Sequence, residues 1–135
     1  MTKLGADDSI TIGEDWDDVL KTEIKANEMN GRVGHKLLSE TDDVRVWRIA
    51  VPPGDRVGFH RHVLNYFWVA INPGRSRSHY ATGETREAAY EAGTTKHFSF
   101  DKGEYMLHDL ENIGDTELIF TTVEFKNSPN EPLSI

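Results

Sequence analysis

The chain has 135 residues, no cysteine and a formal net charge of −8, and these facts exclude several classes of protein. The length suits one domain with a single core. Without cysteine there are no disulfides, thiol nucleophiles or thiolate ligands, so a metal site would need nitrogen and oxygen ligands. The densest basic patch, Arg75-Ser76-Arg77, is too short for a nucleic-acid surface. We therefore expect no nucleic-acid partner.

Residues 1–30 are polar and acidic and are predicted to form an N-terminal arm. They lack the basic region and apolar stretch of a secretory signal, and no apolar run in the chain approaches the length of a membrane span. A cytoplasmic protein with no membrane contact is therefore expected. Residues 15–20 could start a short helix, because the helix dipole favours acidic residues near a helix N-terminus. A strand that packs against a barrel is the alternative.

After residue 31 the pattern changes to short apolar or alternating runs separated by turn signals. The runs are residues 34–38, 44–51, 66–71, 77–80, 96–100, 105–108 and 118–125. Short strands at this spacing are typical of an all-β sandwich or barrel. Only residues 85–92 have a pattern that would also suit a helix. We predict one all-β domain over residues 31–126, followed by an extended tail over residues 127–135.

Two histidines, His60 and His62, are separated by one residue in a segment that reads as a strand. Side chains two apart on a strand share one face, so both imidazoles can reach one metal ion. The pair alone is a weak signal, because six histidines in a chain of this length give such a pair by chance in roughly a quarter of sequences. A strand with two solvent-facing histidines would explain it equally well.

More specific evidence comes from the spacing around these histidines. The first motif of the cupins starts with a glycine, five residues, a histidine, one residue and a second histidine, and Gly54, His60 and His62 match this spacing. Their second motif ends with a histidine, three residues and an asparagine, and His108 and Asn112 match it. The chain therefore resembles a small single-domain cupin over residues 44–125. The resemblance implies a cupin-type β-barrel or jelly roll. It also implies that His60, His62 and His108 bind one divalent ion, either Fe(II), Zn(II), Ni(II) or Mn(II).

The glutamate of the first cupin motif is missing from this chain. Depending on the count, its position falls on Asn65, Tyr66 or Phe67, none of which is a carboxylate. Three neutral histidines leave the full double charge on a divalent ion, which favours an anionic, chelating substrate. Tyr66 is a candidate fourth ligand or proton donor, and hence a candidate catalytic residue. The alternative, which we favour, is that its ring fills the barrel interior.

Other polar residues near the motifs have less specific roles. Second carboxylates often orient metal-binding imidazoles, and the candidates here are Asp109, Glu111 and Glu124. The remaining histidines have no partner at ligand spacing and are expected on the surface or in packing positions: His35, His79 and His97.

The resemblance favours a metalloenzyme that acts on a small anionic organic acid, with oxygen-dependent cleavage by a dioxygenase as the leading reaction. A metal-dependent lyase or isomerase in small amino-acid catabolism, such as β-alanine breakdown, is a further possibility. So is a cupin that binds a metabolite without catalysis. A metal-free epimerase would need an acid–base pair that the sequence does not identify. Small cupins are commonly dimers, so a homodimer is also expected.

Overall fold

The computed structural model describes residues 2–135, which form a short helix and nine β-strands. The helix α1 (Asp18–Ala26) precedes all the strands. The strands are β1 (Lys36–Glu40), β2 (Val44–Val51), β3 (Arg56–His62), β4 (Tyr66–Ala70), β5 (Gly74–His79), β6 (Thr85–Tyr90), β7 (Thr95–Phe98), β8 (Met106–Asn112) and β9 (Leu118–Phe125).

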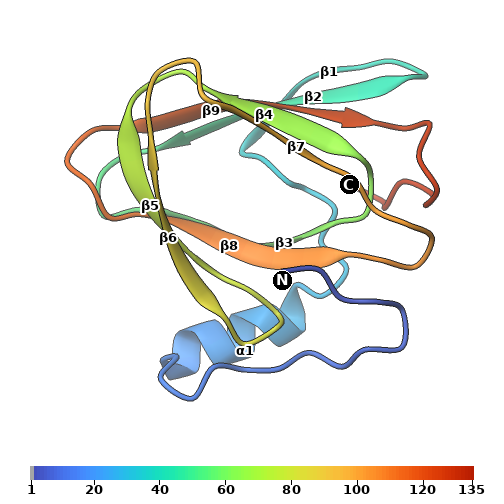
Figure 1. Ribbon diagram of the computed structural model, residues 1–135, viewed down its shortest axis with the longest axis horizontal. Helices are drawn as coiled ribbons and strands as arrows, with labels where there is room; N and C mark the ends of the chain where they lie inside the picture. The colour runs from blue at the N-terminus through green and yellow to red at the C-terminus, as the bar shows by residue number, and fades with distance from the viewer. Residues whose placement is uncertain (1) are drawn as a thin grey trace.

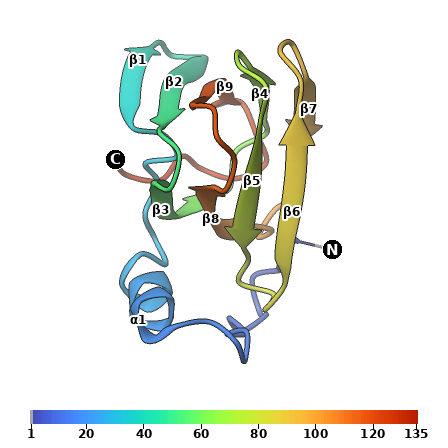
Figure 2. The same cartoon turned by 90° about the vertical axis from the view of Figure 1, so that its left-hand side faces the viewer.

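The strands make two antiparallel sheets that face each other (Figures 1 and 2). One sheet has the order β1-β2-β9-β4-β7, and the other has the order β3-β8-β5-β6. Strands alternate inward and outward side chains, so each sheet presents one apolar face to the interior. On β9, for example, Leu118, Phe120, Thr122 and Glu124 are buried, whereas the residues between them are half-buried. The all-β barrel or jelly roll predicted from the sequence is confirmed.

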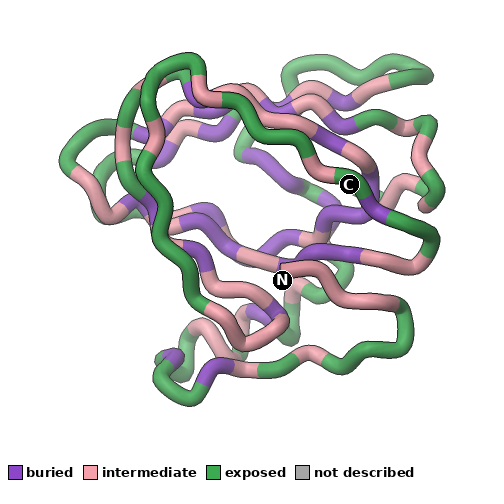
Figure 3. Tube along the Cα trace, viewed as in Figure 1, coloured by how far each residue is buried: buried purple, intermediate pink, exposed green. Residues whose placement is uncertain are grey.

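Three apolar clusters hold the fold together, and the smallest is formed by Tyr66, Phe100 and Met106. A second lies between the two sheets and includes Ile49, Val57 and Phe120. The third lies outside the barrel, where Trp16 and Ile24 pack against Phe59 of β3 and Leu107 of β8. Figure 1 shows α1 beneath β3 and β8, and Figure 3 shows the buried residues concentrated along the strands.

The helix α1 forms where the sequence allowed either a helix or a strand. Asp17 caps it, because its Oδ1 atom accepts a hydrogen bond of 2.9 Å from the Leu20 amide. Ile24 is fully buried and fixes the apolar side of the helix on the barrel. The N-terminal segment before it also contacts the barrel, through a bridge between Leu4 and Tyr105.

The helical alternative for residues 85–92 is wrong. Residues 85–90 form the edge strand β6, whose six residues all pair with β5. Gly83 and Gly93 flank the strand with positive φ angles of 88° each, a conformation that ends a strand sharply and that glycine adopts without strain. The ladder with β5 therefore overrides the local preference of an alanine-containing run for helix. Among the described residues, no helix is long and apolar enough to cross a membrane.

Candidate metal centre

The three predicted histidines converge at one place inside the barrel. His60 and His62 extend from β3 toward the interior, and His108 lies directly opposite His60 on β8. One ring nitrogen from each histidine lies within 4.8 Å of the others. In the part of the chain that the structure describes, this is the one group of histidines and carboxylates with such spacing. The structure thus brings His108 to a histidine pair that precedes it by 46 and 48 positions, a convergence that the pair alone could not establish.

These imidazoles are neutral and have nitrogen lone pairs available for a metal. Burial lowers the pKa of His60, His62 and His108, well below the ordinary value for the last two. His60 is held in one tautomer, because its Nδ1 atom donates a hydrogen bond of 2.8 Å to the Gly58 carbonyl oxygen. Its Nε2 atom is therefore the unprotonated one.

The other two histidines have nitrogen atoms without a protein partner. Nδ1 of His62 and Nδ1 of His108 are both buried and make no hydrogen bond within the described chain. Buried polar atoms are normally satisfied, so each exception needs an explanation. Their rings are instead held by stacking: Tyr66 lies 4.1 Å from His62, and Tyr80 lies 5.2 Å from His108, measured between ring centroids. This nitrogen donor set fits a borderline divalent ion such as Zn(II) or Fe(II).

The histidines line a cavity of about 310 Å³. This volume lies at the small end of the range for ligand pockets. Aromatic rings dominate the wall: Tyr66, Trp68, Tyr80, Tyr90, Phe98 and Phe120. The described lining residues include no aspartate or glutamate, and Lys96 is the one ordinarily charged side chain among them. Lys96 is exposed on β7, an edge strand, and its Nζ atom lies 5.2 Å from the Phe98 ring centroid.

Tyr66 is the residue that reaches the cavity from the place of the missing glutamate. Asn65 turns away, since its Oδ1 atom accepts a hydrogen bond of 2.8 Å from the Phe100 amide. Phe67 contacts His97 and Phe125 instead. Tyr66 is buried among His62, Phe98 and Phe100, so its ring fills the barrel interior as favoured from the sequence. Burial raises the pKa of Tyr66 well above its ordinary value, which keeps the phenol protonated.

The expectation that a nearby carboxylate would hydrogen-bond the imidazoles is wrong for all three candidates. Asp109 follows His108, so its side chain points to the opposite face of β8, where it binds Arg56 and His79. Glu111 lies 3.7 Å from Arg77. Glu124 is inside the barrel, but its Oε1 atom accepts a hydrogen bond of 2.7 Å from Trp47. The Gly58 carbonyl and the two tyrosine rings hold the imidazoles instead.

The other histidines lie outside the cavity, as expected. His35 and His97 are exposed. His79 packs edge-on against Trp16, with ring centroids 5.4 Å apart, and its Nδ1 atom lies 3.0 Å from Asp109 Oδ1. This is a histidine–aspartate pair that the sequence did not identify, but neither residue lines the cavity. It therefore gives no support to an epimerase.

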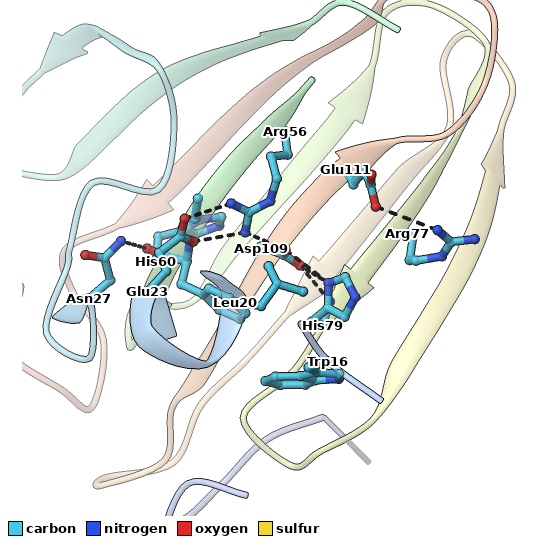
Figure 4. A network of polar contacts seen from close by, with 12 residues as sticks. Trp16, Leu20, Glu23, Asn27, Arg56, His60, Arg77, His79, Asp109 and Glu111 are labelled. Carbon is cyan, nitrogen blue, oxygen red and sulfur yellow. Dashed lines mark hydrogen bonds and ion pairs between the residues drawn. The ribbon is translucent and has the colours of Figure 1, made fainter. Parts of the chain in front are cut away.

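The residues that contact β3, the strand of His60 and His62, from outside the barrel were not identified from the sequence. Glu23 and Asn27 of the α1 region contact the backbone of β3 next to His60 (Figure 4). A signal for them existed in Gly58, because an isolated glycine within a strand pattern often marks a bulge or a close approach by another segment. A Cβ atom at Gly58 would lie 3.2 Å from Glu23 Oε2.

No protein-family model matches the chain, and no curated protein sequence does. Similar structures nevertheless exist. A cupin domain from Bordetella pertussis Tohama I has a TM-score of 0.59 and 24% sequence identity, and the match covers 67% of this chain and 90% of that one. A conserved double-stranded β-helix protein from Klebsiella pneumoniae has a TM-score of 0.55 and 22% identity, over 74% and 82% of the two chains. An RmlC-like cupin family protein from Methanocaldococcus jannaschii has a TM-score of 0.53 and 20% identity, over 67% and 76%.

These likenesses, with the two-sheet topology, define the class. The protein has the cupin fold, a double-stranded β-helix, and within it a cluster of three histidines that could bind a metal ion.

Proposed function

We propose that this protein is a metalloenzyme in which His60, His62 and His108 hold one divalent ion and a small anionic organic acid binds beside it. The observation that carries the proposal is the convergence of three neutral imidazoles at the end of an aromatic cavity without a carboxylate. When bound, the ion would act as a Lewis acid and supply the site for oxygen chemistry or for a polarised oxygen atom of the substrate.

An anionic substrate agrees with the charges around the cavity. Because the histidines are neutral, they compensate none of the charge of a divalent ion. The described lining residues contain no acid that could do so, and Lys96 adds a further positive charge on the exposed edge strand β7. A ligand with one or two carboxylate or enolate groups would supply the missing negative charge.

The aromatic wall favours a substrate with an apolar body. Trp68, Tyr90 and Phe120 contact one another edge to face, with centroid separations of 5.0–5.3 Å. Such a wall accepts planar or branched apolar groups. A substrate that fills the cavity would also shield a reactive intermediate from hydrolysis. We therefore favour oxygen-dependent cleavage of a small organic acid, by a dioxygenase-type reaction.

A lyase or isomerase is less well supported than this reaction. Such chemistry needs a protein group that titrates near neutral pH and can take and return a proton. Burial raises the pKa of Tyr66, Tyr80 and Tyr90, so none of these phenols is a base at neutral pH. The absence of a base among these phenols also supports a second candidate function. In that case the protein binds a metabolite without turnover, and the ion only holds the ligand.

Two measurements test the proposal. Elemental analysis of protein purified without chelators should find about one transition-metal ion per chain. The Fe(II)-loaded protein should then consume oxygen with at least one member of a panel of β-dicarbonyls, thiols and aryl or alkyl carboxylates. The His60→Ala variant is the control and should do neither. Ligand binding without oxygen uptake or any product would favour the binding protein, and a metal-free cavity would refute the proposal.

A further inference from the structure

The strand that carries two of the three histidines is interrupted immediately before the first of them. Val57 pairs with Leu110, and His60 pairs with His108, so three steps along β3 match two steps along β8. Gly58 and Phe59 together face Asp109 and form a β-bulge. Phe59 and His60 are consequently both buried, but on opposite faces: Phe59 belongs to the outer apolar cluster, whereas His60 lines the cavity.

The polar backbone groups of this bulge are bound by the segment 23–30. Glu23 Oε2 accepts a hydrogen bond of 2.9 Å from the Phe59 amide. The side-chain amides of Asn27 and Asn30 both donate to the Phe59 carbonyl oxygen, at 3.1 Å and 3.0 Å. On the other side of His60, the Arg61 amide donates to the Asn30 carbonyl oxygen at 2.7 Å.

The same helix is tied to the strand opposite. Arg56 donates to both carboxylate oxygens of Glu23, at 2.7 Å and 2.9 Å, and to Asp109 Oδ2 at 2.7 Å. Asp109 also accepts the backbone amide of His79 at 2.7 Å. The cluster therefore runs from α1 through β3 and β8 to β5, next to His60 (Figure 4).

Charge keeps this cluster ordered. The hydrogen bonds from Arg56 lower the pKa of Glu23 against the opposing effect of burial. Asp109 is fully buried, and its two oxygens are bound by Arg56 and by the backbone amide of His79. Glu23 is thus ionised at neutral pH, and its pairing with Arg56 is of the bidentate type that fixes geometry as well as charge.

We propose that Glu23, supported by Asn27 and Asn30, is a positioning residue for the metal centre: it fixes the bulge of β3 and thereby the tautomer and direction of the His60 ring. The link is the Gly58 carbonyl, which belongs to the bulge and accepts the His60 Nδ1 proton. If the bulge relaxes, this acceptor moves and the Nε2 lone pair loses its fixed direction. The inference rests on the proposed metal site, since it assigns His60 as a ligand.

The test compares four variants with the wild type. Glu23→Ala removes the contacts to both Phe59 and Arg56, whereas Glu23→Gln keeps an acceptor for the Phe59 amide but loses the charge that holds Arg56. Glu14→Gln makes the same chemical change at an exposed residue of the N-terminal segment. Ile24→Val loosens the packing of α1 without touching a polar contact. If Glu23→Ala does not fold, the double variant Asn27→Ala/Asn30→Ala replaces it.

Zn(II) affinity is measured by competition with a chelating dye, and the visible spectrum of the Co(II)-loaded protein reports ligand geometry. Outer partners of metal ligands typically contribute about 10- to 100-fold in affinity. We expect Glu23→Ala to weaken Zn(II) binding by about 10-fold or more and to change the Co(II) spectrum, with Glu23→Gln between it and the wild type. The Glu14→Gln and Ile24→Val variants should keep the wild-type spectrum.

A third measurement needs no metal. Nitrogen-15 NMR of the metal-free protein identifies the His60 tautomer, which should carry its proton on Nδ1 in the wild type and become mixed in Glu23→Ala. If the wild type binds no metal, the proposed function fails while this measurement still decides the positioning role. The inference would be overturned if Glu23→Ala kept the Zn(II) affinity, the Co(II) spectrum and the His60 tautomer of the wild type. It would also be overturned if Ile24→Val changed these properties as much as Glu23→Ala does.

Discussion

Glu124 offers a quantitative test of the barrel interior, because it is a carboxyl group buried where no cation neutralises it directly. Only 3% of this residue is exposed, and its side chain accepts a hydrogen bond from Trp47 Nε1. Burial raises the pKa of Glu124 from 4.5 to about 7, an effect that the Trp47 bond only partly opposes. In the folded state the group is therefore protonated at pH 5 and ionised at pH 8.

The direction in which pH changes the stability follows from proton linkage. Between pH 4.5 and pH 7 the folded protein holds this proton more tightly than the unfolded chain, so the contribution of Glu124 to stability falls as the pH rises. With each pKa unit worth about 1.4 kcal/mol, the ionised group destabilises the fold above pH 7 by roughly 3 kcal/mol. In Glu124→Gln the amide oxygen can still accept the Trp47 hydrogen bond, and no group titrates.

Urea unfolding of the metal-free wild type and Glu124→Gln at several values between pH 5 and pH 8 checks this reasoning. The free energies of unfolding should be similar at pH 5, and the variant should be more stable by roughly 3 kcal/mol at pH 8. Pairwise comparison cancels the titration of the histidines. Glu117→Gln, at an exposed position just before β9, should show no such divergence. The assignment of a raised pKa to Glu124 would be refuted if the difference in free energy of unfolding between wild type and Glu124→Gln did not change with pH. It would also be refuted if the wild type remained the more stable protein at pH 8.

Four further predictions concern the metal centre. His60→Ala and His108→Ala should lose the metal and keep the β-sheet circular dichroism spectrum, since the apolar clusters carry the fold; full occupancy by elemental analysis would disprove the ligand assignment. Tyr66→Phe should bind metal within about 2-fold of wild type in a calorimetric titration, because phenylalanine keeps the ring that stacks on His62. A large loss would place the phenol oxygen on the ion. Metal affinity should stay nearly constant from pH 8 to pH 6.5 and fall below that range, because burial lowers the histidine pKa values; a steep loss beginning above pH 6.5 contradicts this. Finally, Lys96→Met should weaken benzoate binding to the Zn(II)-loaded protein by about 5-fold in equilibrium dialysis, since an exposed charge contributes up to about 1 kcal/mol. Binding of the uncharged benzamide should weaken by much less. Equal effects on both ligands would show that Lys96 has no part in ligand recognition.

The strands with clear alternation were predictable from the sequence. The runs at residues 44–51 and 118–125 coincide with β2 and β9, because each is a short run rich in β-branched and aromatic residues with one buried face. Residues 85–90 were ambiguous between helix and strand. Five of these six residues are exposed, so burial imposes no alternating pattern on their sequence. Their pairing with β5 is a property of the tertiary structure alone.

The histidines were predictable through motif spacing, but their surroundings were not. Asp109 was considered as a support for the imidazoles because it follows His108, yet alternation sends its side chain outward. It contacts Arg56, which in turn binds Glu23 of the helix. Tyr80 stacks on His108 although 28 residues separate them. Such contacts depend on which strands and helices become neighbours, and spacing along the chain does not encode that.

The bulge in β3 also limits how this gene product can vary. A regular strand would place residues at odd separations on opposite faces, yet Val57 packs between the sheets and His60, three positions later, lines the cavity. Deleting one of the two residues between them would leave Val57 and His60 two positions apart, so both would still face inward, but the bulge and its contacts with the segment 23–30 would be lost. The length of this segment is therefore constrained by the contacts of its bulge with Glu23, Asn27 and Asn30, and not by the need to keep the valine and the histidines on one face.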